Sequence, residues 1–324
     1  MNRRIVLLLP GQGSQHQGMG VHLYEREPVF ATAMDEFFAA TEDDGARLRA
    51  DWLSGTPDVP IDDGPRAQPL LYAVGHAVGR LLIERGLRPG LLLGHSVGEL
   101  AAAALAGVFA PAAGARILRG RSAALAGTPP GGMLAVAAAP DRVAGLITPE
   151  WAAAGLAVGA VNGPAQTILA GADPELALVA EAAAAAGLTC VRVRAHQPFH
   201  SPVLAEAARR FEKAVAAERL RPANTPILSA RTARPVSPQE AVDPAFWAHL
   251  MSEPVLFWPA LAGLPADEGF VFVDTGPGNG LATIARRHPS VRAGISRVVP
   301  LMPPPGRDPW PVWEAGLAAL ADAL

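Results

Sequence analysis

A serine between two glycines is the first candidate for covalent chemistry in this sequence. Ser96 lies in the stretch Gly94-His95-Ser96-Val97-Gly98, which follows three leucines and precedes an alanine-rich run. Glycines on both sides of a serine are typical of a tight turn between a strand and a helix, where larger side chains would collide and the hydroxyl is exposed as a nucleophile. The amino-terminal end of the helix would also favour developing negative charge. The pattern therefore predicts that Ser96 is a nucleophile.

A nucleophilic serine needs a base that takes its proton. Among the 8 histidines we favour His200, in the stretch HQPFHSPVL. It lies just after the last strand expected in a small inserted domain, where the chain returns to the larger one, and sites are common where two domains meet. His196, in the same stretch, stays open as an alternative base. His95 is next to Ser96 in the turn, so we expect its ring to point elsewhere.

A second glycine-rich turn follows the first expected strand, in the stretch LPGQGSQHQGMG at residues 9 to 20. Gly11 and Gly13 would let the backbone approach a ligand closely. A donor from this turn could complete an oxyanion hole together with the amide of Val97. The turn lacks the G-x-G-x-x-G spacing and the acidic residue of a dinucleotide site, so it does not predict nucleotide binding of that kind.

One arginine is expected on the inward face of a helix. At about 100° per residue, Arg121 falls on the same side as Ile117 and Leu118, whereas Arg116 and Arg119 point the other way. A buried arginine needs an anionic partner. That partner could be a carboxylate of the protein, in an internal salt bridge, or a carboxylate of the substrate, held by two parallel hydrogen bonds.

The elements that must position these residues alternate between strands and helices. The sequence predicts strands at 5 to 9 and 90 to 94, a helix near 67 to 85, and further helices from about 97 and 111. Such an order is typical of a parallel sheet covered by helices on both faces.

The segment from 130 to 195 has a different order of expected strands and helices. Its runs follow the order β-α-β-β-α-β, which is the ferredoxin-like arrangement. The fold class expected is therefore α/β: an α/β-hydrolase-like catalytic domain with a parallel sheet, made of residues 1–129 and 196–324, plus a ferredoxin-like domain inserted at 130–195.

Composition narrows the class of protein. The chain has 324 residues, of which 50% are hydrophobic, so it can bury a large core. The net charge is only -3 and no run of like charges occurs, which argues against nucleic acid or an acidic membrane as partner. Cys190 is the only cysteine, and we expect it to be a core residue in a protein of a reducing compartment. The apolar stretches are too short or too interrupted for a signal peptide or a membrane span.

Seven stretches resemble one known family when taken together and in order. They are PGQGSQHQGMG, GHSVGE, RILRGRSAAL, GGMLAV, VNGPAQTILAG, FHSP and DTGPG. In these the chain resembles malonyl-CoA:acyl-carrier-protein transacylases and the acyltransferase domains of polyketide synthases, and the resemblance runs through nearly the whole length.

The resemblance implies a role for each candidate residue. Ser96 matches the nucleophile that becomes acylated, and His200 matches the histidine that activates it. Arg121 matches the arginine that pairs with the free carboxylate of a malonyl group. The backbone amides of Gln12 and Val97 match the oxyanion hole. In this family a backbone carbonyl, rather than an aspartate, orients the histidine.

Four further residues are assigned to the substrate pocket by the same resemblance: His95, Asn162, Phe199 and Leu250. Phe199 resembles the bulky residue that excludes a methyl branch from the acyl group. Leu250 stands where relatives usually carry Asn, Gln or His, and HQPFH replaces the S-H-A-F-H of many malonyl-selective members. Because the family role at the first of these positions is chiefly made by the main chain, we expect activity to survive in a more apolar pocket.

The function implied is transfer of a malonyl group from coenzyme A to the phosphopantetheine thiol of an acyl carrier protein, in fatty acid or polyketide assembly. No metal or redox cofactor is expected, since the CoA thioester is a substrate and the partner protein carries the phosphopantetheine. We expect a free-standing, cytoplasmic, monomeric acyltransferase. Three alternatives stay open: transfer of a different acyl chain between carrier proteins, an editing acyl-thioester hydrolase, and a catalytically silent scaffold that binds carrier proteins.

Overall fold

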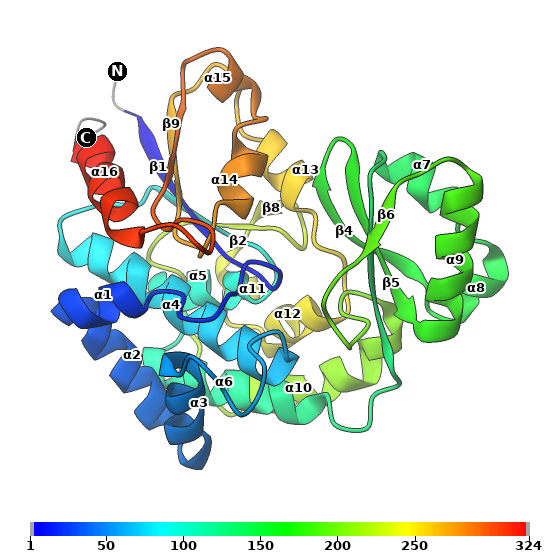
Figure 1. Cartoon of the computed structure of the whole chain (residues 1–324), viewed down its shortest axis with the longest axis horizontal. Helices are drawn as coiled ribbons and strands as arrows, with labels where there is room; N and C mark the ends of the chain where they lie inside the picture. Colours follow the sequence, from blue (N-terminus) through cyan, green and yellow to red (C-terminus); the bar gives the residue numbers. More distant parts are fainter. Residues whose placement is uncertain (1–2, 322–324) are drawn as a thin grey trace.

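Two separate sheets organise the computed structural model, which describes residues 3 to 321 (Figure 1). The larger sheet has six strands, and all neighbours in it are parallel except the last pair. Their order across the sheet is β10 (Arg297–Pro300), β9 (Phe270–Asp274), β1 (Arg4–Leu9), β2 (Leu91–Gly94), β7 (Ile227–Ser229) and β8 (Arg234–Pro235).

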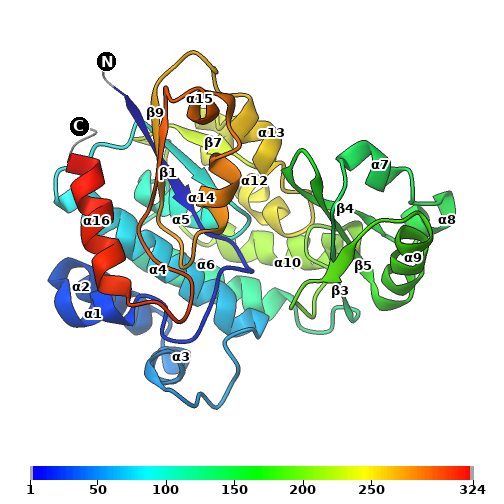
Figure 2. The ribbon, with the colours of Figure 1, turned by 45° about the horizontal axis from the view of Figure 1, so that its top comes forward.

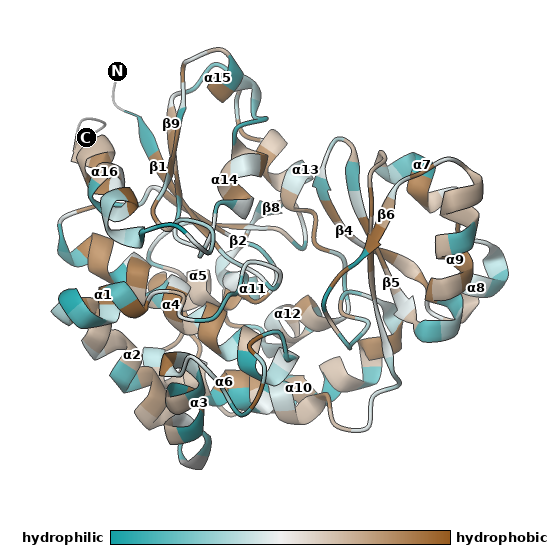
Figure 3. Cartoon of the chain, viewed as in Figure 1, coloured by the Kyte–Doolittle hydropathy of each residue, from teal (hydrophilic) through white to brown (hydrophobic). Residues whose placement is uncertain are grey.

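The central strands are apolar except for Arg4 at the start of β1 and Asp274 at the end of β9, because both faces of these strands are covered. Every residue of β9 and β2 is buried, and in β1 only the first residue is exposed. Continuous runs of this kind, rather than alternating ones, are typical of parallel strands. Figure 3 shows the same pattern as hydrophobic colour along these strands.

Helices of the large domain pack around this sheet and on one another. α5 (Gly98–Leu105) contacts β1, β2 and β7, whereas α14 (Gly280–Ala285) contacts β1, β9 and β10, and α16 (Pro309–Ala321) contacts β10. Several of these helices, such as α2 and α6, have proline in the first turn, where its missing N–H costs nothing. The helices are α1 (Val21–Arg26), α2 (Pro28–Ala40), α3 (Asp43–Leu53), α4 (Gly64–Glu84), α5 (Gly98–Leu105), α6 (Pro111–Ala124), α10 (Ala205–Ala216), α11 (Pro238–Ala241), α12 (Pro244–Ala248), α13 (Phe257–Ala262), α14 (Gly280–Ala285), α15 (Pro289–Arg292) and α16 (Pro309–Ala321), with 3-10 turns η1 (Pro202–Leu204) and η2 (His249–Met251).

The second sheet is antiparallel, in the order β4-β5-β3-β6, and has its own small apolar core. Figures 1 and 2 show it beside the large domain, in green. Its elements along the chain are β3 (Gly131–Val136), α7 (Pro140–Ala144), α8 (Pro149–Ala153), β4 (Ala157–Gly163), β5 (Gln166–Ala172), α9 (Asp173–Ala185) and β6 (Cys190–Arg192).

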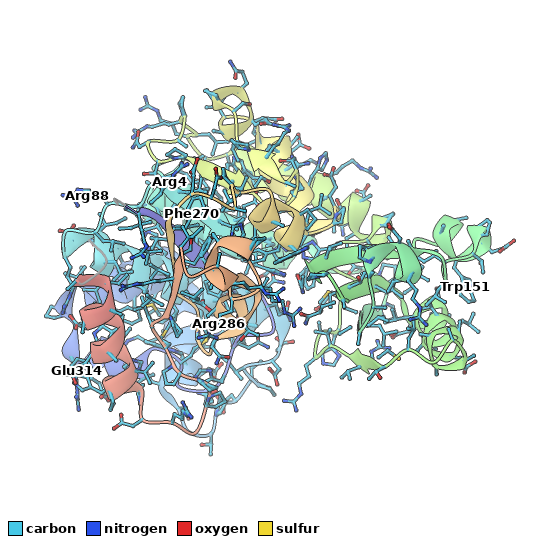
Figure 4. The ribbon with its side chains drawn as sticks, turned by 90° about the horizontal axis from the view of Figure 1, so that it is seen from above. Arg4, Arg88, Trp151, Phe270, Arg286 and Glu314 are labelled. Carbon is cyan, nitrogen blue, oxygen red and sulfur yellow. The ribbon has the colours of Figure 1, made fainter. Side chains whose placement is uncertain are left out.

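The predicted fold class is confirmed. A parallel sheet with helices forms the larger part, and the smaller sheet has the β-α-β-β-α-β order of a ferredoxin-like unit, with one additional short helix, α8. Seen from above, the small unit, with Trp151 labelled, stands beside the large one, where Phe270 and Arg286 are labelled (Figure 4). Between residues 3 and 321, no helix is both long and apolar enough to cross a membrane.

Candidate active site

Ser96 occupies the turn between β2 and α5, and its backbone is in the left-handed region, with φ of 53°. The flanking glycines are sterically required. A Cβ atom on Gly94 would lie 2.2 Å from the amide nitrogen of Glu99, and one on Gly98 would lie 2.4 Å from the carbonyl oxygen of Leu9. The chain therefore makes the sharp strand-to-helix turn that presents a nucleophilic serine.

His200 provides the proton acceptor that the serine needs. Its Nε2 atom lies 2.8 Å from Ser96 Oγ, although the two residues are 104 positions apart. Its Nδ1 atom lies 3.0 Å from the carbonyl oxygen of Glu253. A carbonyl only accepts hydrogen bonds, so Nδ1 must carry the proton and Nε2 is left to accept one from the serine. This is the geometry of a general base.

The environment keeps the imidazole neutral. Burial, followed by the positive charge of Arg121, lowers the pKa of His200 to about 3, and the hydrogen bond to Glu253 acts in the opposite direction. A neutral ring is the form that accepts a proton, so His200 is ready to act as a base at neutral pH.

Gly11 allows the first glycine-rich turn to lie directly against the nucleophile turn. A Cβ atom there would lie 2.5 Å from the carbonyl oxygen of His95, and the amide of His95 donates to Leu9 at 3.0 Å. The amides of Gln12 and Val97 donate to no other protein group within residues 3 to 321. Two free amides beside a serine are what an oxyanion hole requires.

Arg121 is 1% exposed and lies on α6, as the helical periodicity predicts. Its Nε atom donates to Gln68 Oε1 at 2.8 Å, and the guanidinium stacks on the rings of Phe199 and Phe211 at 5.5 and 5.6 Å. Both terminal nitrogens lack a hydrogen-bond partner among the described residues, so no internal salt bridge is found there. Burial lowers the pKa of Arg121 to about 10, which still leaves it charged at neutral pH.

Comparison with known proteins identifies the family to which this site belongs. The family model described as the acyl transferase domain matches residues 6 to 310 of this chain. The chain is an acyl transferase domain. Among curated relatives, a phenolphthiocerol/phthiocerol polyketide synthase polypeptide of Mycobacterium tuberculosis is 36% identical over 306 residues, which are 94% of this chain and 20% of that protein. The chain thus spans about a fifth of the length of that relative.

Solved structures agree with this acyl transferase assignment. The acyltransferase domain from the second module of the salinomycin polyketide synthase has a TM-score of 0.88 and 30% identity, covering 98% of this chain and 73% of that one. The malonyl-CoA:acyl carrier protein transacylase of Xanthomonas oryzae pv. oryzae has a TM-score of 0.84 and 27% identity, covering 100% of this chain and 99% of that one.

The acyl transferase site opens into a cavity of about 630 Å³ between the two sheets. Gln12, Ser96, Phe199 and His200 are among the residues that line it. The inserted domain contributes an apolar wall, made by Met133, Ala135, Ala160 and Ile168. The loop at 277–280, the following residues of α14, and Pro304 and Pro305 also line the cavity.

His95 and Asn162 join the two domains at this cavity. The Nε2 atom of His95 lies 2.8 Å from Asn162 Oδ1, and both residues line the cavity. Burial lowers the pKa of His95, and the bond to Asn162 opposes that shift. The ring of His95 thus points away from Ser96 and toward β4, as expected for its neighbour position in the turn.

Leu250 is placed differently from the other predicted pocket residues. It is buried in the core, and the residues that line the cavity do not include it. The main-chain carbonyl that orients His200 comes from Glu253, three positions farther along. His196, the alternative base, is exposed, so His200 alone of the two contacts the serine.

Two residues of the site, Gln68 and Glu253, were not predicted from the sequence patterns. Gln68, on α4, links Arg121 to the oxyanion turn, because its Nε2 atom donates to Gln12 Oε1 at 3.0 Å. A glutamine in the otherwise apolar run Gln68-Pro69-Leu70-Leu71 would have been the cue. Glu253 acts through its backbone, which leaves no trace in the residue type.

Proposed function

We propose that this acyltransferase moves a malonyl group from coenzyme A to the phosphopantetheine thiol of an acyl carrier protein, through an acyl-enzyme at Ser96. The observation that carries the proposal is the buried guanidinium of Arg121. Its two terminal nitrogens have no partner among the described residues, and it lies over the ring of Phe199, which lines the cavity. Such a cation requires an anion, and the free carboxylate of a malonyl thioester has the planar, two-oxygen geometry that a guanidinium binds.

In the first half of the proposed reaction, Ser96 Oγ attacks the thioester carbonyl while its proton passes to His200 Nε2, 2.8 Å away. The backbone amides of Gln12 and Val97 stabilise the tetrahedral oxyanion. The C–S bond then breaks, His200 returns the proton to the departing CoA sulfur, and a malonyl ester remains on Ser96.

In the second half, the phosphopantetheine thiol gives its proton to His200 and attacks the ester. The ester C–O bond breaks, Ser96 recovers the proton, and the malonyl group leaves as a new thioester. These steps need neither a metal nor a redox cofactor. Water competes poorly in this proposal because Ser96 and His200 are only 6% and 5% exposed.

Selectivity within the malonyl class would depend on Phe199. Its ring lines the cavity and is held by the guanidinium of Arg121 at 5.5 Å. A branch at the α-carbon of the acyl group would have to displace a ring that is packed against the residue binding the carboxylate. We therefore propose that an unbranched malonyl group is preferred over methylmalonyl.

The proposed partners and setting follow from the same chemistry. A separate or linked acyl carrier protein, acting in fatty acid or polyketide assembly, would deliver the thiol. We propose a cytoplasmic location, where malonyl-CoA is available, and action as a monomer.

One other acyl transfer has an observation in its favour. Met133, Ala135 and Ile168 give the cavity an apolar wall that could hold a longer, neutral acyl chain delivered by a carrier protein. A thioester hydrolase is less favoured, because the partner of His200 Nδ1 is a main-chain carbonyl rather than the acidic side chain expected in such an enzyme.

Brief mixing with malonyl-CoA, methylmalonyl-CoA and acetyl-CoA in parallel, followed by intact-protein mass, tests the proposal. A malonyl adduct that is absent from Ser96→Ala and weak with the other two esters is the expected result. No adduct from any CoA ester, in a folded protein, would reject malonyl-CoA as the donor and favour a chain delivered by a carrier protein.

A further inference from the structure

The base His200 is held by a segment that is bonded to both domains. We call residues 251–256 the strap. The amide of His200 donates to the carbonyl of Met251 at 2.9 Å, and its Nδ1 atom is 3.0 Å from the carbonyl of Glu253. The orientation of the imidazole therefore depends on where the strap lies.

The strap is anchored to both domains through its backbone. On the side of the inserted domain, Val255 accepts from the amide of Val161 at 2.8 Å and donates to Gly159 at 2.9 Å, so it adds to the edge of β4. On the side of the large domain, the amide of Leu256 donates to the carbonyl of Ala230, just after β7. Movement of either domain would thus reach the carbonyl that faces His200.

Arg231 is the more buried of two side chains that contact the carboxylate of Glu253, at the catalytic end of the strap; the other is His249, whose Nδ1 atom lies 3.3 Å from Glu253 Oε1. The Nη1 atom of Arg231 donates to Glu253 Oε2 at 2.5 Å, and its guanidinium stacks on the ring of Phe246 at 4.2 Å. The side chain of Arg231 is only 12% exposed, whereas that of Glu253 is 42% exposed. Because the carboxylate and the carbonyl belong to one residue, a rigid partner for the carboxylate restricts rotation of the whole residue.

The backbone of Arg231 is in turn held by the helix of the nucleophile. Glu99, which is fully buried three residues after Ser96, accepts a hydrogen bond from the amide of Ala230 at 3.1 Å. Ser229 Oγ accepts from the amide of Arg231 at 3.1 Å. One series of contacts therefore runs from the nucleophile turn to the carbonyl that orients the base.

We propose that Arg231 is a positioning residue for the Ser96–His200 pair: by holding Glu253, it keeps His200 Nδ1 bonded and Nε2 directed at the serine. The inference rests on the proposed role of this pair in catalysis. An ion pair with a partner that is 42% exposed contributes little to stability. Its effect should be on rate, since a misplacement of about 1 Å in a catalytic group can cost about 100-fold.

The test compares Arg231→Met, Arg231→Lys, Glu253→Ala and the double variant Arg231→Met/Glu253→Ala. Arg234→Met is the matched control, because it breaks the nearby Arg234–Glu240 pair, which does not touch the strap. The readout is the rate at which a fluorophosphonate labels Ser96, followed by intact mass, together with the unfolding temperature.

We expect Arg231→Met and Glu253→Ala each to slow labelling about tenfold or more, with the double variant no slower than the singles. Arg231→Lys should recover part of the rate, and Arg234→Met should match wild type. Should Arg231→Met prove poorly folded, Glu253→Ala carries the comparison, because that side chain is half exposed. The inference would be overturned if Arg231→Met and Glu253→Ala are labelled at a rate within twofold of wild type, or if their losses of labelling rate multiply in the double variant.

The probe also separates this inference from the proposed function. A fluorophosphonate needs only an activated serine, so it requires neither a malonyl group nor a carrier protein. If malonyl-CoA gives no adduct while Arg231→Met still slows labelling, the substrate proposal fails and the positioning role stands. If Ser96→Ala is labelled as fast as wild type, the role of the pair fails, and the inference fails with it.

Discussion

The Nε atom of Arg121 donates to Gln68 Oε1 at 2.8 Å, and Gln68 donates in turn to Gln12 Oε1 at 3.0 Å. A glutamine thus joins the buried cation of α6 to the first glycine-rich turn. Since Nε is occupied, the two terminal nitrogens, which have no partner among the described residues, stay available as one planar pair of donors for the carboxylate of the proposed substrate.

Replacing Arg121 by alanine should separate a charged substrate from a neutral one. Loss of a buried, doubly hydrogen-bonded charge pair costs about 2–5 kcal/mol, so acylation by malonyl-CoA should fall about 30-fold or more. Acylation by acetyl-CoA should change little. Arg119→Ala, on the exposed side of the same helix, is the control, because Arg119 pairs with Glu42 and not with the site. Malonyl acylation that survives in Arg121→Ala would contradict the assignment.

Changing Gln68 should affect substrate binding more than folding. In Gln68→Glu the new carboxylate would lie against Arg121 and compete with the malonyl group, so KM for malonyl-CoA should rise about tenfold or more. Gln68→Leu removes both hydrogen bonds and should lower kcat as well, because Gln12 is no longer held. Steady-state kinetics with malonyl-CoA measure both effects. Unchanged KM in Gln68→Glu would show that the link does not reach the substrate.

The pH dependence of Ser96 labelling should lack the usual acid limb of histidine. Only the neutral ring is a base, and burial holds the pKa of His200 at about 3, with a contribution from Arg121. A lowered pKa moves the loss of activity to lower pH, so labelling by a fluorophosphonate should stay level down to about pH 5. Arg121→Ala removes the nearby cation, so the pKa of His200 should rise and the acid limb should move to higher pH. A limb near the ordinary value of about 6.5 in wild type would contradict the buried, neutral base.

Gly98 should tolerate no side chain. A Cβ atom would lie 2.4 Å from the carbonyl of Leu9 and 2.5 Å from that of Pro10, so the helix would have to move away from β1. Gly98→Ala should therefore destabilise the fold by about 3 kcal/mol or more, measured by denaturant unfolding. Gly280→Ala, at the first position of α14 with open space around it, is the control and should change stability little. Equal stability of the two variants would refute this account.

The sequence predicted those parts of the site that depend on local geometry. The turn at Ser96 follows from glycines that nothing else can replace, and Arg121 follows from helical periodicity within one element. The order of strands and helices in the inserted unit was sufficient for its fold, and the return of the chain placed His200 at the junction.

What could not be predicted involves contacts between distant segments. The acceptor for His200 Nδ1 is the backbone of Glu253, and any residue type offers the same carbonyl, so the expectation centred on Leu250 instead. Gln68 is 53 positions from Arg121, and a helix pattern gives the burial of such a residue without its partner. Roles of this kind depend on the packing of α4 against α6, which becomes visible only in three dimensions.

The apolar wall of the cavity comes from the inserted domain, whereas Ser96, Gln12 and Arg121 belong to the large domain. The apolar wall and the residues proposed for the reaction are therefore encoded by separate stretches of the gene. Substitutions at Met133, Ala135 or Ile168 can reshape this wall of the cavity without altering the nucleophile, its helix or Arg121. A fold divided in this way can diversify its substrates by drift in one segment while the chemistry of the other is inherited intact.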